Sequence, residues 1–244
     1  NYTTGTMEKF GLGYEDVKRG KPDIVYLAMT AFGRPGPMKD FSGFHSVVNL
    51  FSGVAAVTGY PGGHPRILGS TFPDFLAGSY SVLAVLQALH HRTKTGLGQF
   101  IDASMVECML TTIPEAVADY TLNDRETVGA GNRDKVKAPH DVFRCKSDDH
   151  WIAISVSTDK EWQQLCQVIE REDLLADPRF ADELTRWHHQ ADLNPHIESW
   201  TMQHEQYEAM HILQSAGIAA APSLNSMQVL QDPHMVDRGF VNQV

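Results

Sequence analysis

The sequence predicts an α/β fold followed by a second, smaller α+β domain, and three observations carry this prediction. Residues 23–29 form a continuous apolar run bounded by glycine and proline, which is typical of a strand buried on both faces of a parallel sheet. Strand and helix patterns then alternate as far as residue 122. The composition becomes polar and glycine-containing over residues 127–139, and two short strand patterns follow in succession.

Breakers and periodicity define the elements of the first part. Proline and an acid open the helix at Pro73, and basic residues follow its last apolar positions, which suits the polarity of a helix. Glycine-rich stretches end both this helix and the one before it. The predicted elements are a strand over 23–29, a buried helix over 46–57, a helix over 73–92, a short strand over 99–103 and a helix over 104–122.

In the second part, a polar turn over residues 146–149 separates two apolar runs, which indicates a β-hairpin. We therefore divide the chain into residues 1–126, a linker over 127–140 and a small α+β domain over 141–223. The elements predicted after the linker are strands over 141–145 and 151–156, helices over 159–171, 194–202 and 206–216, a strand over 218–222 and a short helix over 227–231.

Composition excludes several classes of partner. The chain has 20 Lys and Arg against 30 Asp and Glu, a formal net charge of −10, whereas nucleic acids and anionic membrane surfaces attract proteins with basic faces. No apolar run approaches the roughly 20 residues that cross a bilayer, so we expect no membrane partner. The three cysteines lie far apart and form no pair, which favours a reducing, cytoplasmic location.

Asp74 is the strongest candidate for chemistry from the residues alone. It lies in the first turn of the clearest helix, where backbone N–H groups and the helix dipole favour an ionised carboxylate. Such a group is a ready nucleophile or base. Gly78 follows four residues later on the same helix face and leaves room for a ligand or another backbone. The alternative is that Asp74 is an ordinary acid of a capping turn and Gly78 a packing contact.

The other chemical motifs are weaker. The paired histidines at 90–91 and 188–189 are adjacent, whereas ligands on one helix face need a spacing of three or four residues, so we expect no metal site. His45 and His140 each stand at the edge of a predicted element beside a loop, and either is a structural residue or part of a site. The glycine-rich phosphate-binding motifs and the GxSxG elbow are absent.

An ordered series of short motifs covers nearly the whole chain, and in their order and spacing the chain resembles the family III CoA-transferases. This family includes formyl-CoA transferase, carnitine CoA-transferase and α-methylacyl-CoA racemase. The motifs are residues 1–13 (NYTTGTMEKFGLG), 22–26 with 32–37 (PDIVY, FGRPGP), 52–53 with 58–59 (SG, TG), 73–78 (PDFLAG), 88–102 (ALHHRTKTGLGQFID), 151–154 (WIAI), 177–180 (DPRF) and 216–218 (AGI).

The resemblance implies a Rossmann-like large domain, of which residues 1–126 are one part, and a return towards it over residues 224–244. It also implies that the chain is an interior piece of a longer protein, which explains the missing methionine at Asn1. Family members interlock as linked rings, so a homodimer is expected. The partners implied are an acyl-CoA and a carboxylic acid, with coenzyme A as co-substrate and no tightly bound cofactor.

The resemblance also assigns roles to individual residues. Asp74 matches the catalytic aspartate, whose carboxylate attacks the acyl-CoA thioester. Asn1 and Tyr2 match an asparagine-aromatic pair beside the CoA pocket, and Lys9 stands where relatives place an arginine near the CoA phosphates. Residues 138–141 (APHD), which include His140, stand where formyl-CoA transferase has a glycine-rich loop over its active site, and this chain lacks those glycines. Their absence argues against formyl-CoA or oxalate as a substrate and suggests that His140 lines a differently shaped acyl pocket.

One departure bears on the reaction type. In racemases of the family, a histidine and the aspartate that matches Asp74 act together as an acid/base pair. Counted from the glycine that matches Gly53, their histidine corresponds to Phe44. This chain has His45 one place later, where many transferases carry an acid. We therefore expect a CoA-transferase with His45 in the substrate pocket. The alternatives are an acyl-CoA racemase or epimerase, and a non-catalytic subunit of a heteromeric transferase.

Overall fold

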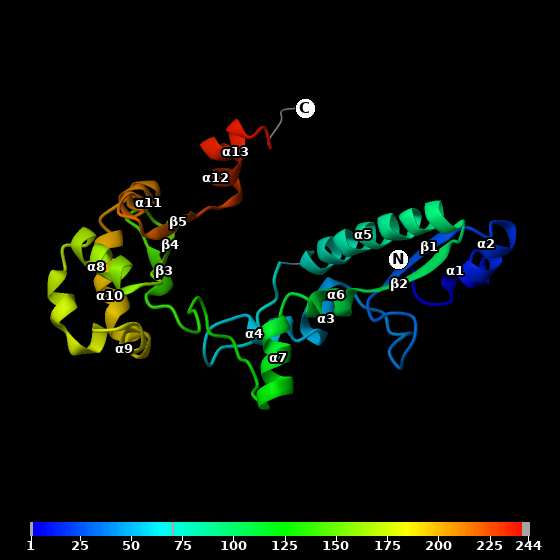
Figure 1. Ribbon diagram of the computed structural model, residues 1–244, viewed down its shortest axis with the longest axis horizontal. Helices are drawn as coiled ribbons and strands as arrows, with labels where there is room; N and C mark the ends of the chain where they lie inside the picture. Colours follow the sequence, from blue (N-terminus) through cyan, green and yellow to red (C-terminus); the bar gives the residue numbers. More distant parts are fainter. Residues whose placement is uncertain (1, 70, 241–244) are drawn as a thin grey trace. The chain divides into compact units, whose positions relative to one another are not determined.

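The computed structural model describes residues 2–69 and 71–240 and forms two compact units (Figure 1). Unit 1 comprises Asn1–Gly131 and unit 2 comprises Asn132–Val244. The division falls within the segment 127–140. The finer boundaries at residues 126, 141 and 223 stay predictions.

Unit 1 contains a parallel pair of strands, as the apolar run predicted. β1 (Val25–Thr30) pairs with β2 (Gln99–Ser104) from Val25 opposite Gln99 to Thr30 opposite Ser104. Both strands therefore end at the same edge, and α5 lies alongside them (Figure 1). The helices of unit 1 are α1 (Thr6–Lys9), α2 (Tyr14–Gly20), α3 (His45–Phe51), α4 (Val54–Val57), α5 (Phe72–Thr95), α6 (Met105–Leu110) and α7 (Pro114–Asn123).

The burial of β1 differs from the prediction, because every one of its residues is half-buried. Within the described residues, β1 pairs with β2 and packs against α5. Much of the rest of the β1 surface is not covered by another described helix or strand. The core of unit 1 instead lies where α3, α4, α5 and α6 meet. Its buried residues are Ala31, Val48, Val54, Ala77, Met105 and Met109.

Helix α5 has the termini that its sequence predicts. Pro73 stands in its first turn beside Asp74, Arg92 and Lys94 stand in its last, and Gly96 closes it at a φ of 75°. The helix has 24 residues and contains an 18-residue stretch with a mean hydropathy of 1.3, so by length and composition it is able to span a membrane, which corrects the expectation that no segment approaches that size. Core helices of soluble proteins pass the same test.

Two predicted helices are each broken in two. Gly53 separates α3 from α4 in the left-handed conformation, at a φ of 79°. Pro114 begins α7 and has no N–H to continue α6, and the preceding Thr111 and Thr112 hydroxyls donate back to the Cys108 and Met109 carbonyls. Apolar periodicity runs through both breaks, so periodicity alone did not show them.

Gly98 is required where the chain enters β2. A Cβ atom there would overlap the carbonyl oxygen of Ile24 and the backbone of Asp23, because the N–H of Gln99 donates to the Ile24 carbonyl at 3.0 Å. We expect Gly98→Ala to lower the free energy of unfolding by about 1–3 kcal/mol or more. Urea unfolding of the full-length protein, followed by circular dichroism, measures this effect.

Gly20→Ala is the matched control for this substitution. A Cβ atom at Gly20 meets nothing within 4 Å, so alanine there should be neutral or stabilising by up to about 1 kcal/mol. An equal response of the two variants would contradict the close approach at Gly98.

Unit 2 is built on a three-stranded antiparallel sheet of order β3-β4-β5, and its first two strands form the predicted hairpin. The strands are β3 (His140–Arg144), β4 (Trp151–Ser155) and β5 (Ala219–Ser223). Helices α8 (Asp159–Val168), α9 (Glu183–His188), α10 (Gln190–Thr201), α11 (Gln206–Ser215), α12 (Ser226–Gln231) and α13 (Pro233–Asp237) accompany two 3-10 turns, η1 (Glu172–Ala176) and η2 (Pro178–Phe180). Its largest buried core residues include Phe143, Ile152, Ile154, Trp162, Leu165, Phe180, Leu193, Ile197 and Leu213.

The helical part of unit 2 corrects the prediction in three places. Helix α9 was not predicted, although Asp182 and Thr185 form a capping box at its start. Helix α10 begins four residues earlier than expected and runs through Pro195, because Leu193 and Ile197 are buried on one face of it. Helix α13 was also missed, and Asp232 caps it by accepting two backbone N–H bonds.

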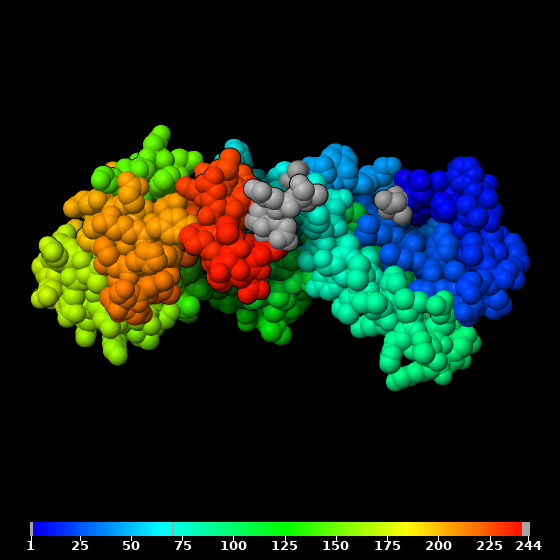
Figure 2. Space-filling view, turned by 90° about the horizontal axis from the view of Figure 1, so that it is seen from above, coloured from blue at the N-terminus to red at the C-terminus, as the bar shows by residue number. Residues whose placement is uncertain are grey.

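The C-terminal helices α12 and α13 pack against the rest of unit 2. Tyr207 on α11 donates its hydroxyl to the Asp232 carboxylate at 2.7 Å, and Gln228 lies 3.2 Å from the ring nitrogen of His150. Burial, together with this hydrogen bond, raises the pKa of Tyr207 to about 12. Figure 2 shows the red surface of α12 and α13 directly beside the orange surface of α11.

A buried arginine ties the start of unit 2 to its helices. The Arg186 side chain is 1% exposed, and its guanidinium donates to the carbonyls of Ala138 and Phe180 and to the Asp159 carboxylate at 3.1, 3.2 and 2.7 Å. It also lies over the Trp162 ring, 5.4 Å from the ring centre. Each nitrogen of this guanidinium thus donates a hydrogen bond, and an aromatic ring lies over the group.

Candidate active site

A cavity of about 260 Å³ lies at the carboxyl end of the β1-β2 pair. In open parallel sheets this edge is where ligands bind, because the loops that leave the strands diverge there. The last residues of β1, the start of α6, the loop before α3 and the first turn of α5 all contribute to it. Its lining residues are Tyr2, Thr3, Thr4, Met29, Thr30, Ala31, Lys39, Phe41, Ser42, Gly43, Phe44, His45, Asp74 and Met105.

Asp74 has the geometry of an available carboxylate. It is the third residue of α5, its side chain is exposed, and its N–H donates to the Thr71 carbonyl at 3.1 Å. Within residues 2–69 and 71–240, no group forms a hydrogen bond or ion pair with its carboxylate oxygens. A carboxylate with this freedom is able to attack an electrophile placed in the cavity.

The described residues of unit 1 leave space beside Gly78. A Cβ atom at this position meets nothing within 4 Å, so no described residue packs against it. The packing interpretation of Gly78 therefore finds no support in the described residues.

The structure brings His45 and Tyr2 to the same cavity as Asp74. His45 is the first residue of α3 and is half-buried, with its ring edge-on to Phe44 at 5.5 Å. Both Phe44 and His45 line the cavity, so the one-residue shift between them does not remove the histidine from the site. Sequence reasoning reached these three positions from separate motifs, and the tertiary fold places them together.

Two other predicted positions lie elsewhere, and one cannot be placed. Lys9 ends α1 with an exposed side chain and does not line this cavity. His140 opens β3 in unit 2, where its Nδ1 lies 2.7 Å from the Asn132 carbonyl oxygen, so that Nδ1 carries the proton that is donated. Asn1 lies outside the described residues.

Sequence reasoning missed Thr30 and Lys39 as lining residues. Thr30 is the last residue of β1, and its hydroxyl oxygen is buried without a hydrogen-bond partner among the described groups. Its place at the carboxyl end of a predicted strand was a usable signal. Lys39 lies in an irregular loop and is held there by a hydrogen bond from the Thr4 hydroxyl to its carbonyl at 2.8 Å. No local pattern marked it.

A second cavity, of about 270 Å³, shares Tyr2, Thr3, Met29 and Thr30 with the first. Its cationic residue is Arg34, whose guanidinium pairs with Glu8 at 2.5 Å and lies over the Phe100 ring. A hydrogen bond to its own backbone N–H, followed by the Arg34 guanidinium, lowers the pKa of the Glu8 carboxyl. Tyr2 thus lines both cavities.

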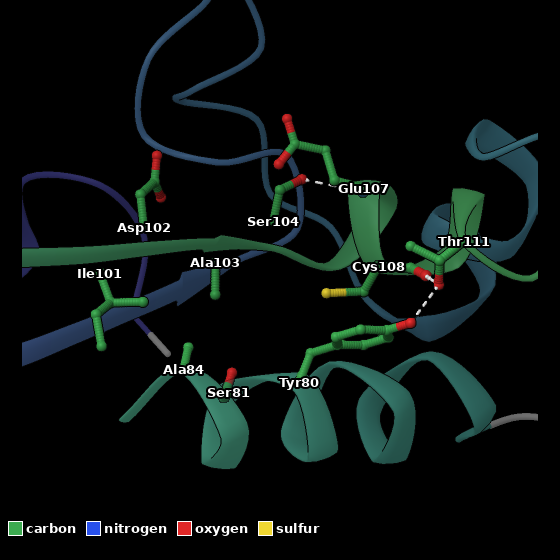
Figure 3. A pocket seen from close by; sticks show the side chains of 10 residues that line it. All are labelled: Tyr80, Ser81, Ala84, Ile101, Asp102, Ala103, Ser104, Glu107, Cys108 and Thr111. Carbon is green, nitrogen blue, oxygen red and sulfur yellow. Dashed lines mark hydrogen bonds between the residues drawn. The ribbon is translucent and has the colours of Figure 1, made fainter. Parts of the chain in front are cut away.

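A further pocket, of about 270 Å³, lies between α5 and β2 (Figure 3). Tyr80 donates its hydroxyl to Thr111 at 2.9 Å, while Asp102 and Glu107 point away from α5 (Figure 3). Burial, and then the charge of Glu107, raises the pKa of the Cys108 thiol, so that this cysteine is not an activated nucleophile. None of the predicted site residues lies here.

The part of the chain that the structure describes contains no group of three His, Cys, Asp or Glu side chains able to hold a metal ion. A carboxylate, an imidazole, an ammonium group and hydroxyls belong to residues that line one small cavity.

Comparisons with known proteins relate the chain to one family. The model of the family described as CoA-transferase family III matches residues 1–244. The chain is 30% identical over 238 residues to succinyl-CoA–D-citramalate CoA-transferase of Chloroflexus aurantiacus, covering 98% of this chain and 59% of that one. It is also 30% identical to succinyl-CoA:mesaconate CoA-transferase of Haloarcula hispanica, covering all of this chain and 61% of the relative.

Solved structures give the same result. A CAIB/BAIF family protein from Brucella suis superposes with a TM-score of 0.91 at 29% identity, over 98% of this chain and 63% of that one. The chain thus spans about three fifths of the length of the proteins that it matches.

Proposed function

The chain belongs to the family III CoA-transferases, as its motifs predicted, and from this we propose that the whole protein moves coenzyme A from an acyl-CoA donor to a carboxylic acid. Asp74 carries the proposal, because its carboxylate forms no hydrogen bond or ion pair with the described residues and lines a cavity at the carboxyl end of the parallel strands. The named relatives transfer CoA from succinyl-CoA to citramalate or mesaconate, which supports a carboxylic acid acceptor.

In the proposed reaction an Asp74 carboxylate oxygen attacks the thioester carbonyl. The carbon–sulfur bond breaks, CoA leaves as a thiolate and a mixed anhydride forms on Asp74. The thiolate then attacks the aspartyl carbonyl, which releases the donor acid and leaves an aspartyl-CoA thioester. The acceptor carboxylate repeats these steps in reverse, forming a new anhydride and then the new acyl-CoA, so that Asp74 is regenerated.

Tyr2 lines both neighbouring cavities, and this supports its proposed place beside CoA. Roles for Asn1 beside CoA, for Lys9 near the CoA phosphates and for His140 in the acyl pocket remain proposals from the family resemblance. A cytoplasmic location and an interlocked homodimer are proposed on the same basis.

A heteromeric enzyme is the second candidate assembly, and one observation favours it. The chain is 31% identical to the beta subunit and 30% identical to the alpha subunit of the Chloroflexus aurantiacus succinyl-CoA–L-malate CoA-transferase. Activity of the purified protein alone supports the homodimer. Activity that needs a second, related chain supports the heteromer.

The direct test is isotope exchange with the full-length protein. The protein is incubated with an acyl-CoA and a labelled free acid, and label is followed into the acyl-CoA. Transfer of label supports the proposal. Loss of the α-proton of the acyl-CoA to solvent, without transfer of CoA, would instead identify a racemase that uses Asp74 with His45.

A further inference from the structure

The cavity that contains Asp74 has two positively chargeable side chains among its lining residues, Lys39 and His45. Lysine carries a compact ammonium charge on a flexible stem, which suits it to bind a single anionic group. Neither Lys39 nor His45 forms an ion pair within the described part of the chain. Lys39 is exposed and its loop is held at Thr4, so its ammonium group is available to a ligand.

An anion bound at Lys39 would belong to the acyl group rather than to the phosphates of CoA. The phosphates are separated from the thioester by the whole pantetheine arm, whereas Asp74, which the thioester must reach, lines the same cavity of about 260 Å³ as Lys39. A small acyl chain therefore brings its far end, and not the CoA diphosphate, towards Lys39.

We propose that the acyl group transferred at Asp74 carries a second, remote carboxylate, and that Lys39 binds it. This inference rests on the proposed function and specifies its substrate class as the CoA thioesters of short dicarboxylic acids. Lys39 is then a specificity-determining residue, and the attack by Asp74 does not require it when the acyl group is uncharged.

The test compares succinyl-CoA with butyryl-CoA in the full-length wild type and in Lys39→Met. We expect Lys39→Met to raise the KM for succinyl-CoA about 10- to 100-fold, because the variant loses a hydrogen bond to a charged group. The kcat/KM for butyryl-CoA should stay within about twofold of the wild-type value. Lys39→Arg should recover part of the loss. Lys160→Met, at an exposed lysine of α8, is the control and should change neither substrate.

Several outcomes overturn the inference and separate it from the proposed function. An equal loss with both donors shows that Lys39 acts on Asp74 or on folding rather than on a remote carboxylate. A wild type that prefers butyryl-CoA leaves CoA transfer standing and refutes the dicarboxylate class. If neither donor is used, the binding of free succinate to wild type and to Lys39→Met is measured by calorimetry. Equal affinities for succinate refute the role of Lys39 independently of turnover.

Discussion

Replacement of Asp74 by asparagine should lower CoA transfer by roughly a thousandfold or more, because the amide is not a nucleophile towards a thioester. The substitution preserves the shape of the side chain at the third position of α5. The Asp74 carboxylate accepts no hydrogen bond from the described residues, so the fold of unit 1 should be unaffected. Isotope exchange between an acyl-CoA and its labelled acid measures the loss, and circular dichroism checks the fold.

Glu115→Gln provides the matched control. Glu115 lies in the first turn of α7, directly after a proline, and its side chain is exposed, so it occupies a helix position like that of Asp74 without lining the cavity. This variant should keep full activity. Trapping completes the test, since hydroxylamine or borohydride added after the acyl-CoA should modify Asp74, as located by mass spectrometry. Modification at another carboxylate, or full activity of Asp74→Asn, would overturn the mechanism.

Replacement of Arg186 by methionine should lower the free energy of unfolding of unit 2 by about 1–3 kcal/mol for each buried carbonyl that it leaves without a donor. Methionine fills most of the volume but leaves the buried carbonyls of Ala138 and Phe180 without their donor. All 4 tryptophans of this sequence lie at or after residue 151, so their fluorescence reports on unit 2 during urea unfolding. Far-ultraviolet circular dichroism follows the whole protein in parallel.

Arg179→Met is the control for this effect. The Arg179 side chain is 47% exposed and pairs with Asp177 at 2.7 Å, so its removal should change the free energy of unfolding by about 1 kcal/mol at most. A loss at Arg186 no larger than the loss at Arg179 would show that the buried hydrogen bonds contribute little. The difference between the two losses of unfolding free energy measures how much more a buried arginine stabilises the fold than an exposed one.

Much of the fold was predictable because its determinants are local. Helix α5 is bounded by a proline at one end and by Gly96 at the other, and the hairpin of β3 and β4 is bounded by a short polar turn. Each signal lies within a few residues of the element that it defines. The same argument applies to Asp74, whose position in a helix N-terminal turn is a property of the sequence around it.

The errors arose where a local rule met a tertiary contact. Helix α10 runs through Pro195 because burial of its apolar face outweighs the lost hydrogen bond. This outcome cannot be read from periodicity, which records the residues of one segment and not what packs on it.

The sequence by itself determined the family of this protein, the alternation of strands and helices in unit 1, and the candidate nucleophile. Only the tertiary structure showed that the end of β1, the loop that carries Lys39 and the first turn of α5 line one cavity. These segments are separated by tens of residues, so their meeting depends on the parallel pairing of β1 with β2 and on the packing of α5 beside both strands. Contacts of this kind follow from the folded chain as a whole, because no short segment contains both partners.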